Sequence, residues 1–191
     1  MHGLINRAIQ CFIEDTYGSS AWIEIAARSS LPDGEFEALR LYDPALTDTL
    51  IATATKHLDK DRASLLEDLG TYLVSHPNRA SLRRLLRFGG QNFDDFLHSI
   101  DDLPDWARLA VPDLTLPGLE LHSLGQGEYR IEIEENFRGA IHVALGLLRG
   151  MADDYGVLAV LSLSSDHPGV AVQVHEHQFS AGRDFHLAAS L

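Results

Sequence analysis

Ten histidines and twenty-eight acidic residues give this 191-residue chain many side chains that could do chemistry. His175 and His177 are two positions apart in a stretch with the alternation of a β-strand, so both should face the same side. Two imidazoles placed in this way can hold a metal ion when a third ligand joins them, and Asp166 or His167 could be that ligand. A metal-dependent enzyme centred on His175 and His177 is therefore one hypothesis, and a polar strand face in contact with solvent is the other.

Serine, aspartate and histidine, the residue types of a hydrolase triad, stand side by side at positions 165–167. Side chains of sequence neighbours usually point apart, whereas a triad needs them to converge, so these three predict a turn before the last strand. Adjacent acidic residues on a helix also diverge, by about 100°. We expect solvated helix faces and helix ends at Asp94-Asp95, Asp101-Asp102 and Asp153-Asp154. The sequence contains no nucleophile elbow, P-loop or dinucleotide-binding glycine pattern.

The composition limits the partners that the chain could bind. A net charge of -13 argues against nucleic acid and against anionic membrane surfaces, because both need clustered lysine and arginine. The N-terminal residues lack the continuous apolar stretch of a signal peptide, and no run approaches the roughly 18 apolar residues of a membrane-spanning helix. We therefore expect a cytoplasmic protein that could dock on a basic protein surface. The single cysteine, Cys11, lies among apolar helix positions and is interpreted as a core residue.

The elements that must position these residues begin with an all-helical half. Apolar residues recur at helical spacing, and Gly18, Pro44 and Pro77 mark places where helices start or stop. A turn is predicted at residues 32–34. Helices are predicted at about 5–17, 20–27, 44–58, 61–75, 81–88 and 93–111. The last of these contains Pro104, a residue type that helix interiors exclude.

Alternation of apolar and polar residues after position 112 predicts a mixed second half. The expected elements are two strands of a hairpin, a long helix and two further strands, at 119–124, 128–134, 139–155, 157–163 and 170–178. The chain is thus predicted to be one α+β domain over residues 1–191. It divides into a helical subdomain at 1–111, a mixed subdomain at 112–180 and a tail at 181–191.

Several short patterns, in this order along the chain, resemble the H-NOX family of haem nitric oxide/oxygen-binding sensor domains. They are MHGLI at 1–5, DTYG at 15–18, FDDFLHSIDDL at 93–103, TLPGL at 115–119 and VALGLLRGMADDYG at 143–156. Each motif alone is short, and their shared order and spacing carry the resemblance, which runs from Met1 to about Tyr155. It implies an H-NOX-like fold, in which a helical subdomain precedes a strand–strand–helix–strand–strand subdomain.

The resemblance also implies a haem pocket, and the position that ligates the iron in the family falls on Pro104. Proline has no side-chain donor atom and cannot ligate iron. Two histidines could replace it, His98 on the same predicted helix and His76 at the end of an earlier one. For both, a surface or capping role is the alternative. The resemblance therefore implies haem as the cofactor, bound weakly or in an altered way.

Three further positions correspond to the Tyr-x-Ser-x-Arg motif with which the family holds the haem propionates. Arg138 is retained and could pair with a carboxylate, whereas Glu134 and Asn136 replace the tyrosine and the serine. A carboxylate at position 134 would repel a propionate. Pro117 corresponds to the proline that presses on the haem. The apolar pocket-lining positions of the family correspond to Ile5, Ile9, Val143 and Leu147.

The function implied by the resemblance is that of a non-catalytic sensory or regulatory domain in a gas-sensor family. In this family a change at the pocket moves the helical half against the mixed half, and a partner such as a cyclase, a kinase or a chemotaxis protein reads it. The chain is too short to contain such an output domain, so we expect signalling through a separate protein. One alternative is a haem-free scaffold, or a protein that binds an apolar or tetrapyrrole ligand without an iron bond. The metal-dependent enzyme with His175 and His177 is the other.

Overall fold

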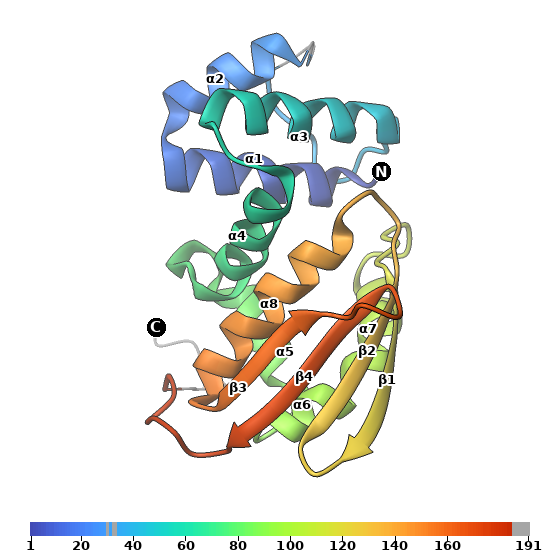
Figure 1. Ribbon diagram of the computed structural model, residues 1–191. Coiled ribbons are helices and arrows are strands. Elements are labelled where there is room, and N and C mark those ends of the chain that lie inside the picture. The colour runs from blue at the N-terminus through green and yellow to red at the C-terminus, as the bar shows by residue number, and fades with distance from the viewer. Residues whose placement is uncertain (30, 32–33, 185–191) are drawn as a thin grey trace, which may run out of the picture.

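Three helices at the N-terminus form a layer at one end of the molecule (Figure 1). The structure is a computed structural model that describes residues 1–29, 31 and 34–184. The layer consists of α1 (Gly3–Tyr17), α2 (Ser19–Arg28) and α3 (Pro44–Leu58). Its core contains Phe12, Trp22 and Leu50, and Cys11 packs against this core as predicted. Pro32 and Asp33 of the predicted turn and residues 185–191 of the predicted tail lie outside the described residues.

The next helix, α4 (Arg62–Ser75), carries the chain from this layer into the second half, where it crosses α8 (Ala140–Tyr155) (Figure 1). Two glycines make the crossing close. A Cβ at Gly70 would overlap the carbonyl oxygen of Val143, and a Cβ at Gly146 would overlap that of Glu67. Thr71 Oγ1 donates a hydrogen bond to the Gly146 carbonyl over 3.2 Å. The two backbones therefore touch at a point where any side chain would separate them.

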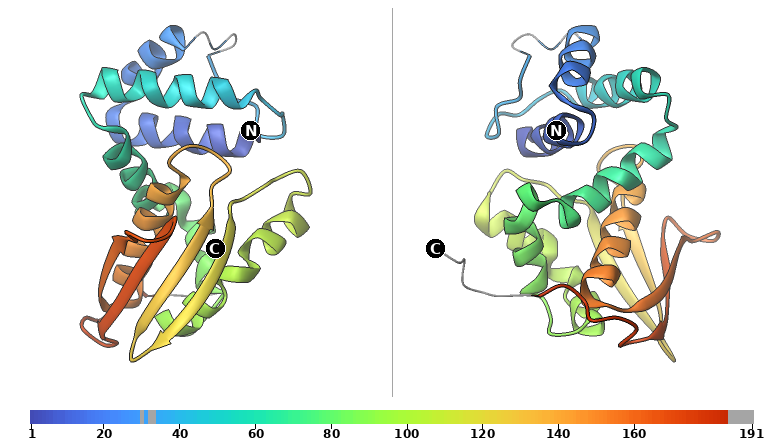
Figure 2. Two further views of the ribbon diagram at one scale, coloured as in Figure 1. Left: turned by 45° about the vertical axis from the view of Figure 1, so that its right-hand side comes forward. Right: turned by 90° about the vertical axis from the view of Figure 1, so that its left-hand side faces the viewer.

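A four-stranded antiparallel sheet packs against α8 (Figure 2). Its strands, in the spatial order β1-β2-β4-β3, are β1 (Gly118–Gly125), β2 (Glu128–Glu134), β4 (Gly169–Glu176) and β3 (Leu158–Leu163). The buried face of the sheet includes Ile131, Val170 and Val172, which share one core with Leu148 and Met151 of α8. The predicted α+β order of a helical half followed by two strands, a helix and two strands is confirmed.

The helix predicted over 93–111 is broken in the structure, and this part of the prediction was wrong. The segment forms α6 (Phe93–His98), the 3₁₀ turn η2 (Ile100–Asp102) and α7 (Leu103–Ala110), after η1 (Pro77–Arg79) and α5 (Ala80–Arg87). Pro104 is the second residue of α7, where a backbone N–H has no partner within the helix, so proline costs no hydrogen bond there. No helix in the described part of the chain is long and apolar enough to cross a bilayer.

One of the acidic residues that were expected in solvent is buried instead. Asp154, at the end of α8, is 1% exposed, and its Oδ1 accepts a 2.6 Å hydrogen bond from Nε of Arg83. Its Oδ2 lies 3.7 Å from Nη1 of Arg87. Asp153, its neighbour, is exposed as predicted. The prediction was wrong for Asp154 because α5 covers this end of α8 and supplies the arginines that pair with the carboxylate. The spacing of acidic residues does not reveal such a tertiary contact.

Candidate ligand-binding site

A cavity of about 480 Å³ lies where the N-terminal layer meets the second half. Its wall contains residues of α1, of every helix from α4 to α8, of β1 and β2, and of the loop before β1. From α1 it receives Leu4, Ile5 and Ala8. From α8 it receives Ala140, Val143, Ala144, Leu147 and Leu148. An occupant would therefore touch both halves of the fold at once.

The wall of this cavity is almost entirely apolar. Asn136 and the indole N–H of Trp106 are the polar side-chain groups that the described lining contains. The amide Nδ2 of Asn136 is already used, because it donates a 2.8 Å hydrogen bond to the carbonyl of Thr115. Its Oδ1 is buried and has no hydrogen-bond partner among the described residues. The lining described here contains no charged side chain, so the cavity is suited to an apolar ligand.

Some residues of α5 and α7 that line the cavity are also exposed. Leu85 of α5 lines the cavity although it is 51% exposed. Ala110, at the end of α7, also lines it and is exposed. These two residues place part of the cavity lining at the molecular surface.

Five of the residues assigned to the pocket from sequence line this cavity: Ile5, Pro117, Asn136, Val143 and Leu147. Ile9 does not line it. One turn along α1 from Ile5, Ile9 is 3% exposed and packs into the core of the N-terminal layer. Whether Ile9 faces the pocket or the core of the layer depends on how α1 is rotated about its own axis. Helical spacing alone does not fix that rotation.

Pro104 lies beside the cavity on a half-buried face of α7. Its neighbours Leu103 and Ala107 line the cavity, and Pro104 is not among the lining residues. The position that should hold an iron ligand is therefore close to the cavity wall but offers no donor atom.

The two charged members of the predicted propionate-binding motif lie outside the cavity. Glu134, at the end of β2, is exposed and borders a separate surface hollow with Gly118 and Pro168. Arg138 is exposed. Its backbone carbonyl accepts a 2.8 Å hydrogen bond from Nη2 of Arg62. Its neighbour Phe137 lines the cavity in its place. The pairing of Arg138 with an anionic ligand stays a prediction, and such an anion would lie away from the cavity wall.

The two histidines considered as substitute iron ligands also lie away from the cavity lining. His98 ends α6 with an exposed side chain, and its ring packs edge-on against Tyr129 at 5.9 Å between centroids. His76 caps the end of α4 and stacks on Tyr72 at 4.9 Å, with its Nδ1 3.3 Å from the backbone nitrogen of Asn78. Both occupy the surface or capping positions that were the alternative.

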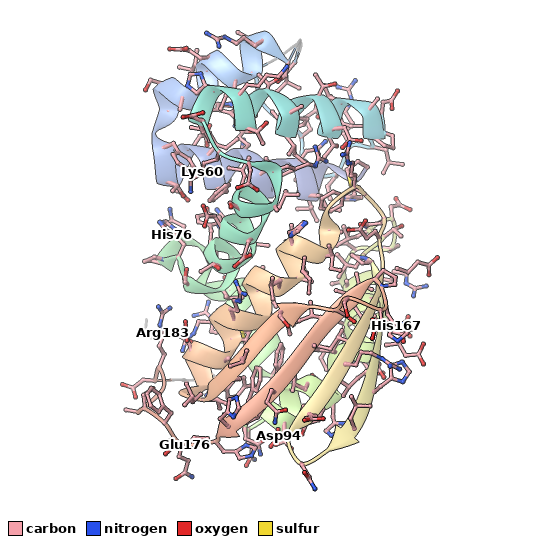
Figure 3. All side chains as sticks on the ribbon, in the orientation of Figure 1. Lys60, His76, Asp94, His167, Glu176 and Arg183 are labelled. Carbon is pink, nitrogen blue, oxygen red and sulfur yellow. The ribbon has the colours of Figure 1, made fainter. Side chains whose placement is uncertain are left out.

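The proposed metal set around His175 and His177 does not assemble. His167 and Glu176 lie at opposite ends of β4 (Figure 3), so neither Asp166 nor His167 can join a site at the far end of that strand. His177 lies after the strand and places its Nδ1 3.1 Å from Oδ2 of Asp94. The strand ends before His177, so the period-two argument does not apply to this pair, and a third ligand depends on the fold.

Sequence reasoning missed a different cluster on the outer face of the sheet. Ligand atoms of Glu120, His122 and Glu132 lie within 4.8 Å of one another. The signal was partly present, since Glu120 and His122 are two apart on β1, but Glu132 joins them through the β1–β2 register. Nε of Arg130 lies 3.3 Å from the Glu132 carboxylate and offsets part of its charge. Arg130 therefore offsets the charge of one of the two carboxylates in the cluster.

The lining from α5 was also missed. Leu82, Leu85 and Leu86 belong to a short helix that the arginines made look like a basic surface element. Trp106 of α7 was likewise seen only as part of a helix pattern. In α5 the apolar residues form a narrow stripe between arginines, and that amphipathic stripe was the available signal.

Curated relatives align with most of this chain. It is 24% identical over 154 residues to soluble guanylate cyclase gcy-31 of Caenorhabditis elegans, covering 81% of this chain and 22% of that protein. It is 19% identical over 155 residues to soluble guanylate cyclase 89Db of Drosophila melanogaster, covering 81% and 23%. The chain thus spans less than a quarter of the length of either relative.

Solved structures share the fold. An H-NOX protein from S. oneidensis superposes with a TM-score of 0.79 at 16% identity, covering 93% of this chain and 98% of that one. An H-NOX protein from K. algicida gives a TM-score of 0.76 at 20% identity, covering 92% and 97%. A family model described as haem-NO-binding matches residues 2–160. With the cavity in place and this match over most of its length, the chain belongs to the haem-NO-binding, or H-NOX, family.

Proposed function

We propose that this chain is a non-catalytic sensory or regulatory module that responds to the occupancy of its cavity and signals through a separate protein. The observation that supports this most directly is the wall of the cavity, which α1 and α8 build together. A ligand that enters contacts both halves, and it shifts their arrangement to the extent that it binds one arrangement more tightly than another. Movement of the helical half against the mixed half is also what the H-NOX resemblance implies.

The partner is proposed to be a separate cyclase, kinase or chemotaxis protein. The guanylate cyclase relatives are about four times longer than the matched region, since that region spans 22% and 23% of them. The net charge of -13 suits docking on a basic surface, and it disfavours nucleic acid and anionic membranes. A cytoplasmic location is part of the same proposal and is supported by the names of those soluble relatives.

Haem iron does not fit the residues that are present. Protein ligands to haem iron are histidine, cysteine, methionine or tyrosine. None of these types occurs in the described lining of the cavity, and the expected ligand position is Pro104. A propionate would find no cation in that wall either, because Arg138 lies at the surface. We therefore propose that haem binding is weak, and the sensing role is attributed to the cavity rather than to iron.

The first prediction concerns haem affinity. Purified protein titrated with haem should bind it at least roughly tenfold more weakly than the Pro104→His variant, a factor that corresponds to about 1.4 kcal/mol. Histidine at this half-buried position supplies the missing donor next to Leu103 and Ala107, which line the cavity. The measurement is the Soret band during titration.

A matched control for this variant is Pro112→His, which places an imidazole on an exposed loop. It should leave haem binding unchanged. Stoichiometric binding of haem to the natural chain, with the spectrum of a histidine-ligated iron, would contradict the proposed weak binding.

The haem-free scaffold is the second candidate, since the wall lacks an iron donor. Amide hydrogen exchange separates the two functions. If the chain is a sensor, occupancy of the cavity should slow exchange in α2 of the N-terminal layer and in β4 of the sheet, which contribute no residue to the described cavity lining. A scaffold would show protection only at residues that contact the ligand.

A further inference from the structure

We propose that the cavity binds an uncharged, metal-free, apolar molecule of the kind represented by a long-chain alcohol. The proposal rests on the proposed function, because it names the class of molecule whose arrival the module would report. It goes further in excluding both a metallated tetrapyrrole and a fatty-acid anion as occupants. Three properties of the cavity carry it: the size, the missing charges and the missing metal donors.

The size and shape suit a small molecule. Packed protein interiors contain few voids larger than a water molecule, whereas this cavity measures about 480 Å³. Ligand pockets fall between roughly 300 and 1,000 Å³ and are lined mainly by apolar and aromatic side chains. Phe96, Trp106 and Phe137 supply aromatic surface to this wall. A cavity of this composition does not hold water well, so an apolar occupant is the stable filling.

The missing charges decide between a neutral ligand and an anion. A carboxylate taken into an apolar site needs a cationic or hydrogen-bonding partner. The described lining has no lysine, arginine or histidine, and the amide nitrogen of Asn136 donates to the Thr115 carbonyl over 2.8 Å. The remaining donor named above, the indole N–H of Trp106, is neutral and cannot balance the charge of a carboxylate. Arg138, the cation expected from sequence, is exposed outside the lining. The cavity therefore favours a neutral molecule over the matching acid.

The two tryptophans of the chain allow a direct readout. Trp106 lines the cavity, whereas Trp22 is 3% exposed in the core of the N-terminal layer, where its Nε1 donates to the Gly34 carbonyl over 2.9 Å. A dye that enters the cavity should accept excitation energy from Trp106 at short range. The Trp106→Phe variant should lose most of this signal, and Trp22→Phe should keep most of it.

The experiment uses Nile red, a neutral apolar dye, with the full chain. The dye should bind saturably, and dodecanol should displace it at a concentration at least tenfold lower than dodecanoate does. Displacement by dodecanoate at an equal or lower concentration would overturn the assignment of a neutral ligand. Failure of dye and alcohol to bind would overturn the proposal as a whole.

Cavity-filling variants locate the binding. Ala144→Phe on α8 and Ala107→Phe on α7 each place a ring in the wall from a different element, so one remains informative if the other does not fold. Each should weaken dye binding at least tenfold. Ala27→Phe, at an exposed position of α2, is the matched control and should not. Urea unfolding shows which variants are folded, and equal weakening in the control would contradict the location.

The outcomes keep this inference apart from the proposed function. If dodecanol does not bind, while haem bound to Pro104→His still slows hydrogen exchange in α2 and in β4, which lie outside the described lining, the sensing role stands and the ligand class is wrong. If dodecanol binds at the cavity but protects only its contact residues, the ligand class stands and the sensing role is wrong.

Discussion

Replacing Gly146 with alanine is expected to lower the free energy of unfolding by about 3 kcal/mol, at the upper end of typical overpacking costs. The new methyl group would overlap the carbonyl oxygen of Glu67 on α4, and a backbone atom cannot rotate away as a side chain can. Alanine favours a helix over glycine by about 1 kcal/mol, so the clash must exceed this gain. Urea unfolding followed by circular dichroism measures the net effect.

Gly150→Ala is the matched control on the same helix. Its methyl group would meet a side-chain atom of Val74 rather than backbone, and Val74 can shift slightly. The same gain in helix propensity applies, so the net loss should be about 1 kcal/mol or less. Equal losses in the two variants would show that the α4–α8 crossing is looser than its glycines indicate.

Replacing Asp154 with alanine should cost a similar amount, about 3 kcal/mol, for an electrostatic reason. The carboxylate is 1% exposed and accepts a 2.6 Å hydrogen bond from Arg83, whose own side chain is only 19% exposed. Removing one partner of a buried pair leaves the other charge poorly solvated, which typically costs about 3–5 kcal/mol. The same unfolding measurement applies, and the loss should persist at high salt because the pair is shielded from solvent.

Asp153→Ala provides the comparison, because it removes the same charge from the exposed neighbour. Its effect should stay within about 0.5 kcal/mol. Asp154→Asn keeps the shape of the side chain but removes its charge. Its loss of unfolding free energy should therefore lie between those of Asp154→Ala and Asp153→Ala. If Asp154→Ala were as mild as Asp153→Ala, the arginines would have sufficient partners elsewhere.

Much of the fold could be predicted from sequence because its elements are strongly patterned. The strand at 128–134 was predicted with the bounds of β2, and the helix at 139–155 differs from α8 by one residue. The segment 93–111 was harder, because its apolar spacing survives a change from α-helical to 3₁₀ geometry at η2. Pro104 was the local sign that one continuous helix does not run through this segment. It marks the start of α7 rather than a kink within one helix.

The site was predictable only where residues face the cavity by simple periodicity. Val143 and Leu147 are four apart on α8 and both line the cavity. Arg138 and Phe137 differ by one position, and the loop between β2 and α8 decides which of them faces inward. Asp154 shows the same limit, because its partners come from α5, about seventy residues earlier in the chain. Contacts between residues far apart in the chain cannot be predicted from the spacing of residues within one segment.

The glycine crossing of α4 and α8 has a consequence for how the chain folds. Thr71 and Gly146 are hydrogen-bonded across 75 positions, so this contact forms only after a long loop has closed. The crossing also joins α4, most of whose buried apolar residues belong to the core of the N-terminal layer, to α8 of the other half. A fragment that stops at residue 111 would leave the face of α4 that carries Gly70 without its partner. The smallest unit that folds cooperatively should therefore include α8, and the two halves are expected to melt in a single transition.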